Sequence, residues 1–149
     1  MNSQTAQLAA AAARLVVEDG LEYALAKRKA ARALGSRAAL PNNEAVEAEV
    51  RSYLALYCAQ TQAAELRALR QLALRWMLRL AEFRPHLGGA AWRGTATRQS
   101  SLHLDLYCDD VKAMEIALIN LGIAYDQANL PGTRHGDPVA LLSLSLIHI

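Results

Sequence analysis

Hydrophobic positions recur at helical spacing through the first part of the chain. Apolar residues three or four positions apart mark one face of a helix. This spacing predicts four helices, over residues 5–18, 21–34, 44–59 and 61–83. Gly20 and Gly35 follow the first two helices, where glycine readily takes the left-handed conformation that ends a helix. Asn43 is expected to cap the third helix and Pro85 to end the fourth. Residues 1–84 are therefore predicted to form a helical region.

Beyond Pro85 the pattern changes to short strands around one helix. Residues 101–108 alternate as a half-buried strand does. One side of this strand carries Leu102, Leu104 and Leu106, and the other carries His103, Asp105 and Tyr107. The other predicted elements are a strand over 86–92 broken by a Gly-Gly pair, a helix over about 110–121 capped by Asp109 or Asp110, and strands over 123–129 and 139–149. The order β-β-α-β-β predicts an α+β fold whose sheet occupies residues 85–143.

Composition narrows the class of protein. Ala and Leu supply much of the 53% hydrophobic content and aromatic residues only 5%, which favours helices packed closely through small side chains. The formal net charge of +2 does not by itself indicate nucleic acid. No apolar run approaches the roughly 18–20 residues of a membrane span, so no membrane partner is expected. Cys58 and Cys108 match no zinc or redox spacing, and free thiols in a reducing cytoplasm are the simplest interpretation.

The charges are unevenly distributed along the chain. A basic cluster occupies the second predicted helix and the residues after it, at Lys27, Arg28, Lys29, Arg32 and Arg37. Phosphate contacts need only charge and reach, so residues 27–32 and the arginine-rich helix 61–83 are candidates for nucleic-acid binding. Residues 9–35 also resemble the start of a tetracycline-repressor-type regulator, although Pro41 would interrupt its recognition helix. The alternative interpretation of the basic cluster is a solvated helix face.

The most specific pattern is the stretch 87–110, LGGAAWRGTATRQSSLHLDLYCDD. A helix, a Gly-Gly pair, a polar loop and a strand with polar residues at alternate positions follow one another. This order resembles the polymerase-β-like nucleotidyltransferase superfamily, in particular its minimal members. In that family, small residues let the backbone approach nucleotide phosphates, and two carboxylates at alternate strand positions hold divalent metal. Such a pair can hold two ions that clamp the attacking and leaving oxygens.

The resemblance implies a role for individual residues. Gly88 and Gly89 match the small-residue pair that approaches phosphate. His103 and Asp105 match the two metal-binding acids, and Asp126 on the following predicted strand matches a third acid. The cations that would neutralise phosphate charge are Arg93 and Arg98. If transfer takes place, Asp105 and Asp126 would be the catalytic residues and Mg²⁺ the cofactor.

The chain departs from the family's pattern at two positions. Gly89 stands where the family has serine, and His103 stands where a carboxylate belongs. Imidazole is a poor Mg²⁺ ligand. If the register slips by two residues, Ser101 and His103 occupy the metal positions and no acid remains. We therefore expect a degenerate nucleotidyltransferase-like protein. A β-bulge or tight turn at the Gly-Gly pair, and a transition-metal site that adds His86, are the other interpretations.

Two longer segments, EDGLEYALAKRKAARALG and RWMLRLAEFRPHLGG, resemble a group of proteobacterial proteins that sometimes carry the label UDP-N-acetylmuramate–alanine ligase. Such ATP-dependent ligases use a Gly-rich phosphate loop that ends in Gly-Lys-Ser/Thr. The chain has no Gly-Lys dipeptide, and 149 residues are too few for the three domains of such an enzyme. A Mur-type ligase is therefore not expected.

The last six residues, LSLIHI, resemble the in-frame translation of a transposon-end adapter used in sequencing libraries. Residues 144–149 are accordingly expected to be a non-native tail, and the natural chain to continue past Ser143. Under this interpretation the sheet is truncated and His148 is not a ligand. The alternative is a genuine alternating strand.

These observations leave three functional hypotheses. The first is a bacterial, cytoplasmic, nucleotidyltransferase-like protein that binds a nucleotide with divalent metal. The second is a non-enzymatic nucleic-acid-binding or regulatory protein, which would use the basic residues of the helices. The third is a simple interaction module.

Overall fold

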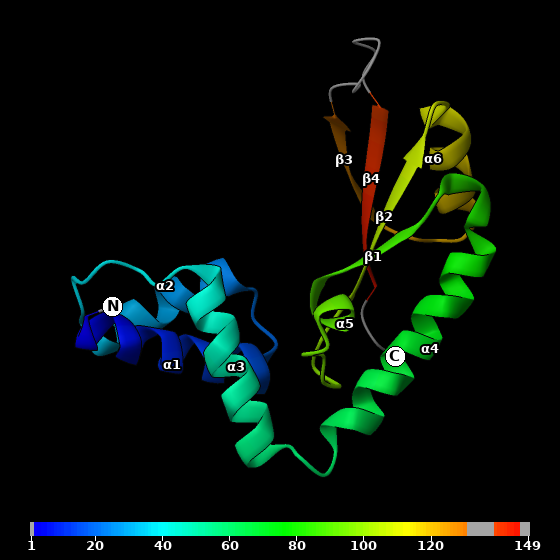
Figure 1. The fold of residues 1–149 in the computed structure, drawn as a ribbon. Coiled ribbons are helices and arrows are strands. Elements are labelled where there is room, and N and C mark those ends of the chain that lie inside the picture. Colours follow the sequence, from blue (N-terminus) through cyan, green and yellow to red (C-terminus); the bar gives the residue numbers. More distant parts are fainter. Residues whose placement is uncertain (1, 131–138, 147–149) are drawn as a thin grey trace. The chain divides into compact units, whose positions relative to one another are not determined.

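The computed structural model describes residues 2–130 and 139–146. Their elements, in chain order, are α1 (Ser3–Asp19), α2 (Tyr23–Leu34), α3 (Asn43–Tyr57), α4 (Gln62–Arg79), the 3₁₀ turn η1 (Ala81–Phe83), β1 (His86–Gly88), α5 (Gly89–Arg93), β2 (Leu102–Cys108), α6 (Val111–Asn120), β3 (Tyr125–Leu130) and β4 (Val139–Leu146) (Figure 1). The predicted α+β class with a helical N-terminal half is confirmed.

The chain forms two compact units. The helical unit consists of the residues up to Glu65 together with Thr95–Ser100. The sheet unit consists of Leu66–Gly94 together with the described residues from Ser101 onward. The units thus divide inside α4, whereas composition predicts a division near residue 84.

In the helical unit, α1 packs against both α2 and α3. The core is formed by one face of each helix, with the buried residues Leu8, Ala12, Ala13, Val17, Ala26, Ala30, Val46, Val50 and Leu54. Many of these residues are alanines, and small side chains let helix backbones approach closely. The helix ends follow the expected chemistry, because Gly20 and Gly35 both take left-handed conformations after α1 and α2. The third helix is capped by Asn42, which accepts a hydrogen bond from the Ala45 amide, and not by Asn43 as predicted.

A hydrogen-bonded side-chain cluster joins α1 to α3. The Tyr53 hydroxyl donates to Glu18 Oε1 at 2.6 Å, and Arg14 Nε donates to Glu18 Oε2 at 3.0 Å. The ring of Tyr57 lies 4.8 Å from that of Tyr53, measured between centroids. This cluster fixes the register of α3 along α1 at the exposed edge of the core.

The loop between α5 and β2 completes the helical unit. Thr95, Ala96 and Thr97 are buried. Gln62 Nε2 donates to the Ala96 carbonyl at 2.8 Å. Gly20 has a φ of +69°, and a Cβ there would lie 2.8 Å from the Gln99 carbonyl oxygen, so this close approach requires glycine.

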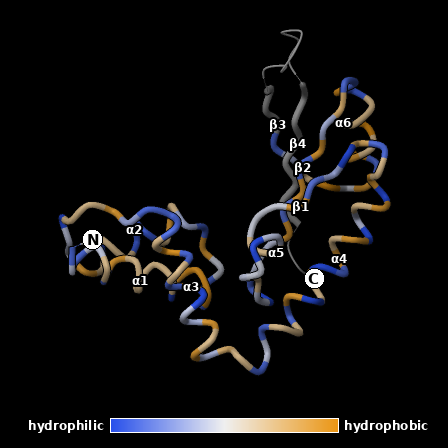
Figure 2. The backbone as a smooth tube through the Cα atoms, in the orientation of Figure 1, coloured by the Kyte–Doolittle hydropathy of each residue, from blue (hydrophilic) through white to orange (hydrophobic). Residues whose placement is uncertain are grey.

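The sheet unit contains four described strands in the order β1-β2-β4-β3, and all neighbouring pairs are antiparallel. Most of the buried residues lie in α4, in β2, in α6 or just after α4, and they include Leu69, Ala73, Leu80, Leu102, Leu104, Leu106, Met114 and Leu118. In Figure 2 hydrophobic and hydrophilic positions alternate along α4, as expected for a helix with an apolar stripe on one side and arginines on the other. Asp110 caps α6 by accepting a hydrogen bond from the Ala113 amide. The sequence predicts either Asp109 or Asp110 as this cap, and the structure selects Asp110.

The predicted strand over 86–92 is wrong beyond its third residue. The strand β1 ends at Gly88, and the five residues from Gly89 to Arg93 form the helix α5. Gly89 has a φ of +67°, which turns the chain out of the extended conformation. The residues that follow include two alanines, good helix formers, of which Ala91 is buried. The observed order is therefore β-α-β-α-β-β.

Smaller differences concern element ends. The fourth helix stops at Arg79, and η1 leads to Pro85. Residues 144–146, in the segment predicted to be an adapter translation, extend β4, and Leu144 pairs with Leu104 of β2. The loop predicted over 131–138 and His148 lie outside the described residues. In the part of the chain that the structure describes, no helix combines the length and apolar character needed to cross a membrane.

Candidate functional site

The polar side of β2 is where the sequence places it. Leu102, Leu104 and Leu106 are fully buried, whereas His103, Asp105 and Tyr107 are only partly buried. The strand period of two puts these three polar residues on one face of the sheet. The predicted alternation is confirmed, and this face is the candidate site.

The Gly-Gly pair lies next to His103. Gly88 is the direct partner of His103 in the β1–β2 ladder. A Cβ at Gly89 would lie 2.7 Å from His103 Cδ2. The ring thus occupies the space that a side chain at Gly89 would fill, which gives this glycine a steric role beside the phosphate role implied by the resemblance. A Cβ at Gly88 would meet nothing within 4 Å, so the first glycine faces open space.

The two predicted catalytic acids lie in one row across the sheet. Asp105 of β2 pairs with Ser143 of β4, and Ser143 also pairs with Asp126 of β3. Directly opposed residues share a face, so both carboxylates emerge on the same side. Because β4 lies between them, their backbones are about 9.5 Å apart, two strand spacings. Sequence reasoning places Asp126 on the next strand along the chain, but that strand is not next to β2 in the sheet.

The donor set does not fit a two-metal transfer site. Within residues 2–130 and 139–146 no three His, Cys, Asp or Glu side chains are grouped so that they could hold a metal ion. This also leaves the combination of His86, His103 and Asp105 without the geometry of a transition-metal site. A single Mg²⁺ is usually held by one or two carboxylates together with the phosphates of its nucleotide. Asp105 fits that lesser role.

His86 and Tyr107 form the edge of the site. His86 is the partner of Asp105 in the β1–β2 ladder, and its ring meets that of Tyr107 edge-on, with centroids 4.9 Å apart. His86 Nδ1 lies 2.7 Å from the carbonyl oxygen of Arg84. A carbonyl only accepts, so Nδ1 is the donor in this contact. Arg84 itself has a φ of +48° and donates from Nε to the Tyr107 carbonyl at 3.3 Å.

The two predicted phosphate-binding arginines lie in different units. Arg93 is the last residue of α5 and is exposed, in the same unit as the site. Arg98 belongs to the helical unit, where its backbone amide donates to Glu65 Oε2 at 2.9 Å. Of the two arginines, Arg93 therefore belongs to the same unit as the sheet residues of the candidate site.

Sequence reasoning missed Trp92. Its side chain is 69% exposed, which is unusual for the largest apolar side chain. The signal was present in the chain, because Trp92 follows Gly89 by three residues, the spacing of one helical turn. The predicted strand over residues 86–92 places Gly89 and Trp92 on opposite faces, and their relationship is therefore not visible from that prediction.

The predicted nucleic-acid-binding residues of α2 divide into two groups. Ala26 and Ala30 are buried, and on the opposite side Arg28, Lys29 and Arg32 are exposed. Lys27 is partly buried, and its ammonium donates to the Pro41 carbonyl at 3.0 Å. Lys27 thus holds the loop before α3, and three of the four cations form the outward face.

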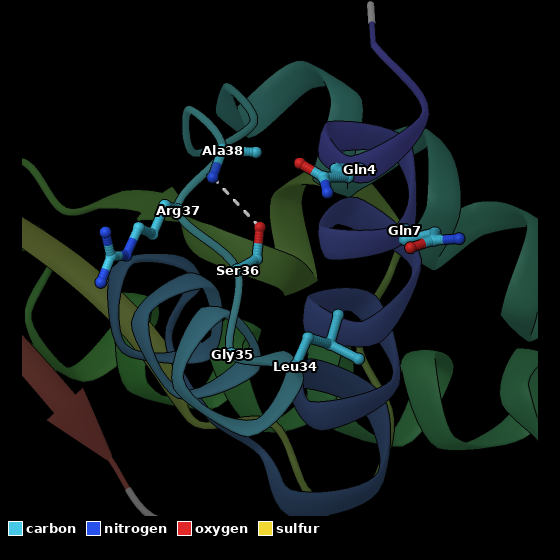
Figure 3. Close-up of a pocket in the computed structure, with 7 residues that line it drawn as sticks. All are labelled: Gln4, Gln7, Leu34, Gly35, Ser36, Arg37 and Ala38. Carbon is cyan, nitrogen blue, oxygen red and sulfur yellow. Dashed lines mark hydrogen bonds between the residues drawn. The ribbon is translucent and has the colours of Figure 1, made fainter.

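A shallow cavity of about 490 Å³ lies between the start of α1 and the end of α2. Its lining consists of Gln4, Gln7, Leu34, Gly35, Ser36, Arg37 and Ala38. Ser36 Oγ accepts a hydrogen bond from the Ala38 amide, and the Arg37 guanidinium extends away from the two glutamines (Figure 3). The lining groups do not converge on a common point as they do in a built ligand site.

Comparison with models of protein families, with curated proteins and with solved structures found no match.

Proposed function

We propose that the sheet unit is a nucleotidyltransferase-like module that binds a nucleotide together with Mg²⁺ and has lost transfer chemistry. The observation that supports this most directly is the β1–β2 register, in which Gly88 opposes His103 and His86 opposes Asp105. Residues that the sequence resemblance assigns to phosphate and to metal are thereby neighbours on one sheet face.

Each residue then has a definite part. The backbone at Gly88 faces open space and can approach a phosphate. Asp105 binds the Mg²⁺ that the nucleotide phosphates bring with them, and Arg93 offsets phosphate charge. The imidazole of His103 stands where the resemblance implies the other metal-binding acid. Asp126 lies on β3, which β4 separates from the strand of Asp105. Two-metal activation of an attacking oxygen lacks its donor set, so binding without transfer is the function that we propose.

Calorimetric titration with Mg²⁺–ATP tests the binding. We expect saturable binding by the wild-type protein and an affinity at least about ten-fold lower for Asp105→Asn. Loss of a residue that only hydrogen-bonds to a metal ligand typically costs about 10- to 100-fold, and loss of the ligand itself should cost no less. Asp109→Asn is the matched control, since Asp109 is exposed and close in sequence. The proposal fails if the wild-type protein does not bind, or if the two variants bind equally well.

A second candidate function rests on the outward face of α2. Arg28, Lys29 and Arg32 gather there without being part of the helical core. If they bind nucleic-acid phosphates, the logarithm of the association constant should fall linearly with the logarithm of the salt concentration. Each phosphate contact should contribute about −0.9 to the slope. The triple alanine variant should bind more weakly and with a smaller slope, whereas Lys112→Ala of the sheet unit should not. A cytoplasmic location remains a prediction under both functions.

A further inference from the structure

Gly89, which lies beside the His103 ring, is the first residue of α5, and Trp92 and Arg93 follow it by about one helical turn. Residues three and four positions apart are neighbours on a helix surface. Helical side chains also lean toward the N-terminus, which is here the Gly88–Gly89 turn.

The backbone that carries Trp92 is held by Arg70 of α4. The Arg70 guanidinium donates from Nε to the Ala91 carbonyl at 2.8 Å and from Nη2 to the Trp92 carbonyl at 3.4 Å. Gly94 then closes the helix in a left-handed conformation. The indole is therefore an exposed aromatic surface on a fixed support, one helical turn from the Gly-Gly pair.

We propose that the Trp92 indole stacks on the base of the nucleotide bound at the candidate site. The inference rests on the proposed function, which places the nucleotide's phosphates at the Gly88–Gly89 turn. Every nucleobase has a π face, so stacking recognises the presence of a base with little regard to its identity. Trp92 would then distinguish a nucleotide from free polyphosphate, which the glycines and Asp105 cannot do.

The test compares ATP with inorganic triphosphate, each with Mg²⁺, by calorimetry. Trp92→Ala should bind ATP roughly 5- to 160-fold more weakly than the wild-type protein, the range expected for loss of one stacked base. The same variant should bind triphosphate as the wild-type protein does. Trp92→Phe keeps a smaller ring and should recover part of the ATP affinity.

Fluorescence provides an independent readout because the chain has two tryptophans. In Trp76→Phe, Trp92 is the remaining tryptophan, and stacking by ATP should quench its emission whereas triphosphate should not. In Trp92→Phe, the emission of Trp76, which lies beneath the Arg79 guanidinium, should not respond to either compound.

The possible failures are distinguishable. If the wild-type protein binds neither compound, the proposed function and this inference both fail. If the wild-type protein binds both compounds and Trp92→Ala binds ATP equally well, the proposed function survives and base stacking is excluded. An exposed Trp92 would then have to serve another purpose, such as contact with a protein.

Discussion

The imidazole of His103 lies in the space where a side chain at Gly89 would begin, with Cδ2 2.7 Å from the position of a Cβ. Gly89 also has a φ of +67°, a conformation that other L-residues rarely adopt. Two independent constraints, backbone conformation and the neighbouring ring, thus require glycine at this position.

Gly89→Ala should destabilise the sheet unit by roughly 2–4 kcal/mol. About 1–2 kcal/mol comes from the left-handed backbone, and the rest from displacing the ring, which resembles overpacking. Urea unfolding followed by circular dichroism measures the change.

Two further variants separate these contributions. Gly88→Ala adds the same methyl group in open space and should change stability by less than about 0.5 kcal/mol. In the double variant Gly89→Ala/His103→Ala the steric part should disappear and the backbone part remain. Equal losses at residues 88 and 89 would contradict the explanation.

The cluster of Glu18, Tyr53 and Arg14 should make the helical unit's stability depend on acid pH. Hydrogen bonds from the Tyr53 hydroxyl and the Arg14 guanidinium lower the pKa of Glu18 below its ordinary value of 4.5. A lowered pKa stabilises the fold above the unfolded-state pKa, and this stabilisation is lost as the pH falls through the folded-state pKa. The difference in unfolding free energy between the wild-type protein and Tyr53→Phe should therefore be largest near neutral pH and shrink below pH 4.5. A difference that does not vary with pH would show that Glu18 is not involved.

The same hydrogen bond has an alkaline counterpart. Two main causes raise the pKa of Tyr53 from 10.0 to about 12: the larger is the hydrogen bond to the Glu18 carboxylate, and the smaller is burial of the hydroxyl. A raised pKa stabilises the fold below pH 10, and the stabilisation disappears as the pH rises through 12. In a titration of tyrosinate absorbance, the late-titrating component should be missing from Tyr53→Phe. In Glu18→Gln it should move back toward pH 10, and an unchanged component there would assign it to another tyrosine.

Asp110→Ala should destabilise α6 by about 1 kcal/mol, the usual value of a lost N-cap. Asp110 Oδ1 accepts a hydrogen bond from the Ala113 amide at 3.2 Å, and the neighbouring Asp109 is not the cap. Asp109→Ala is therefore the control, and thermal unfolding should show a lower midpoint for Asp110→Ala alone. Asp110→Asn keeps the acceptor and should recover most of the loss.

Local signals predicted much of the fold. The alternation of β2, the glycines after α1 and α2, and the cap of α6 depend on neighbours a few positions away in the chain. The five-residue helix α5 was missed because one turn is too short to show a helical period, and because Gly-Gly is also compatible with a bulge. Trp92 belongs to this helix, so its position could not be predicted either.

The remaining differences depend on long-range contacts. The sequence places Asp126 on the strand that follows Asp105 along the chain, and strands that follow each other usually are neighbours in a sheet. Here β4 pairs with both β2 and β3 and separates the two acids. Likewise, nothing near Lys27 in sequence indicates that its ammonium would bind the Pro41 carbonyl, or that the loop at Arg98 would complete the helical unit.

The strand order also determines when the sheet can assemble during synthesis. A ribosome releases the chain from its N-terminus, and β2 emerges with β1 as its first partner, through a short ladder of three residue pairs. Its longer ladder, such as the pairing of His103 with Ser145, must wait until β4 has emerged. Until then the leucines of β2 have an open strand edge beside them, where another nascent chain could pair. The interval before β4 is made is therefore a period in which this strand edge is open to misassembly.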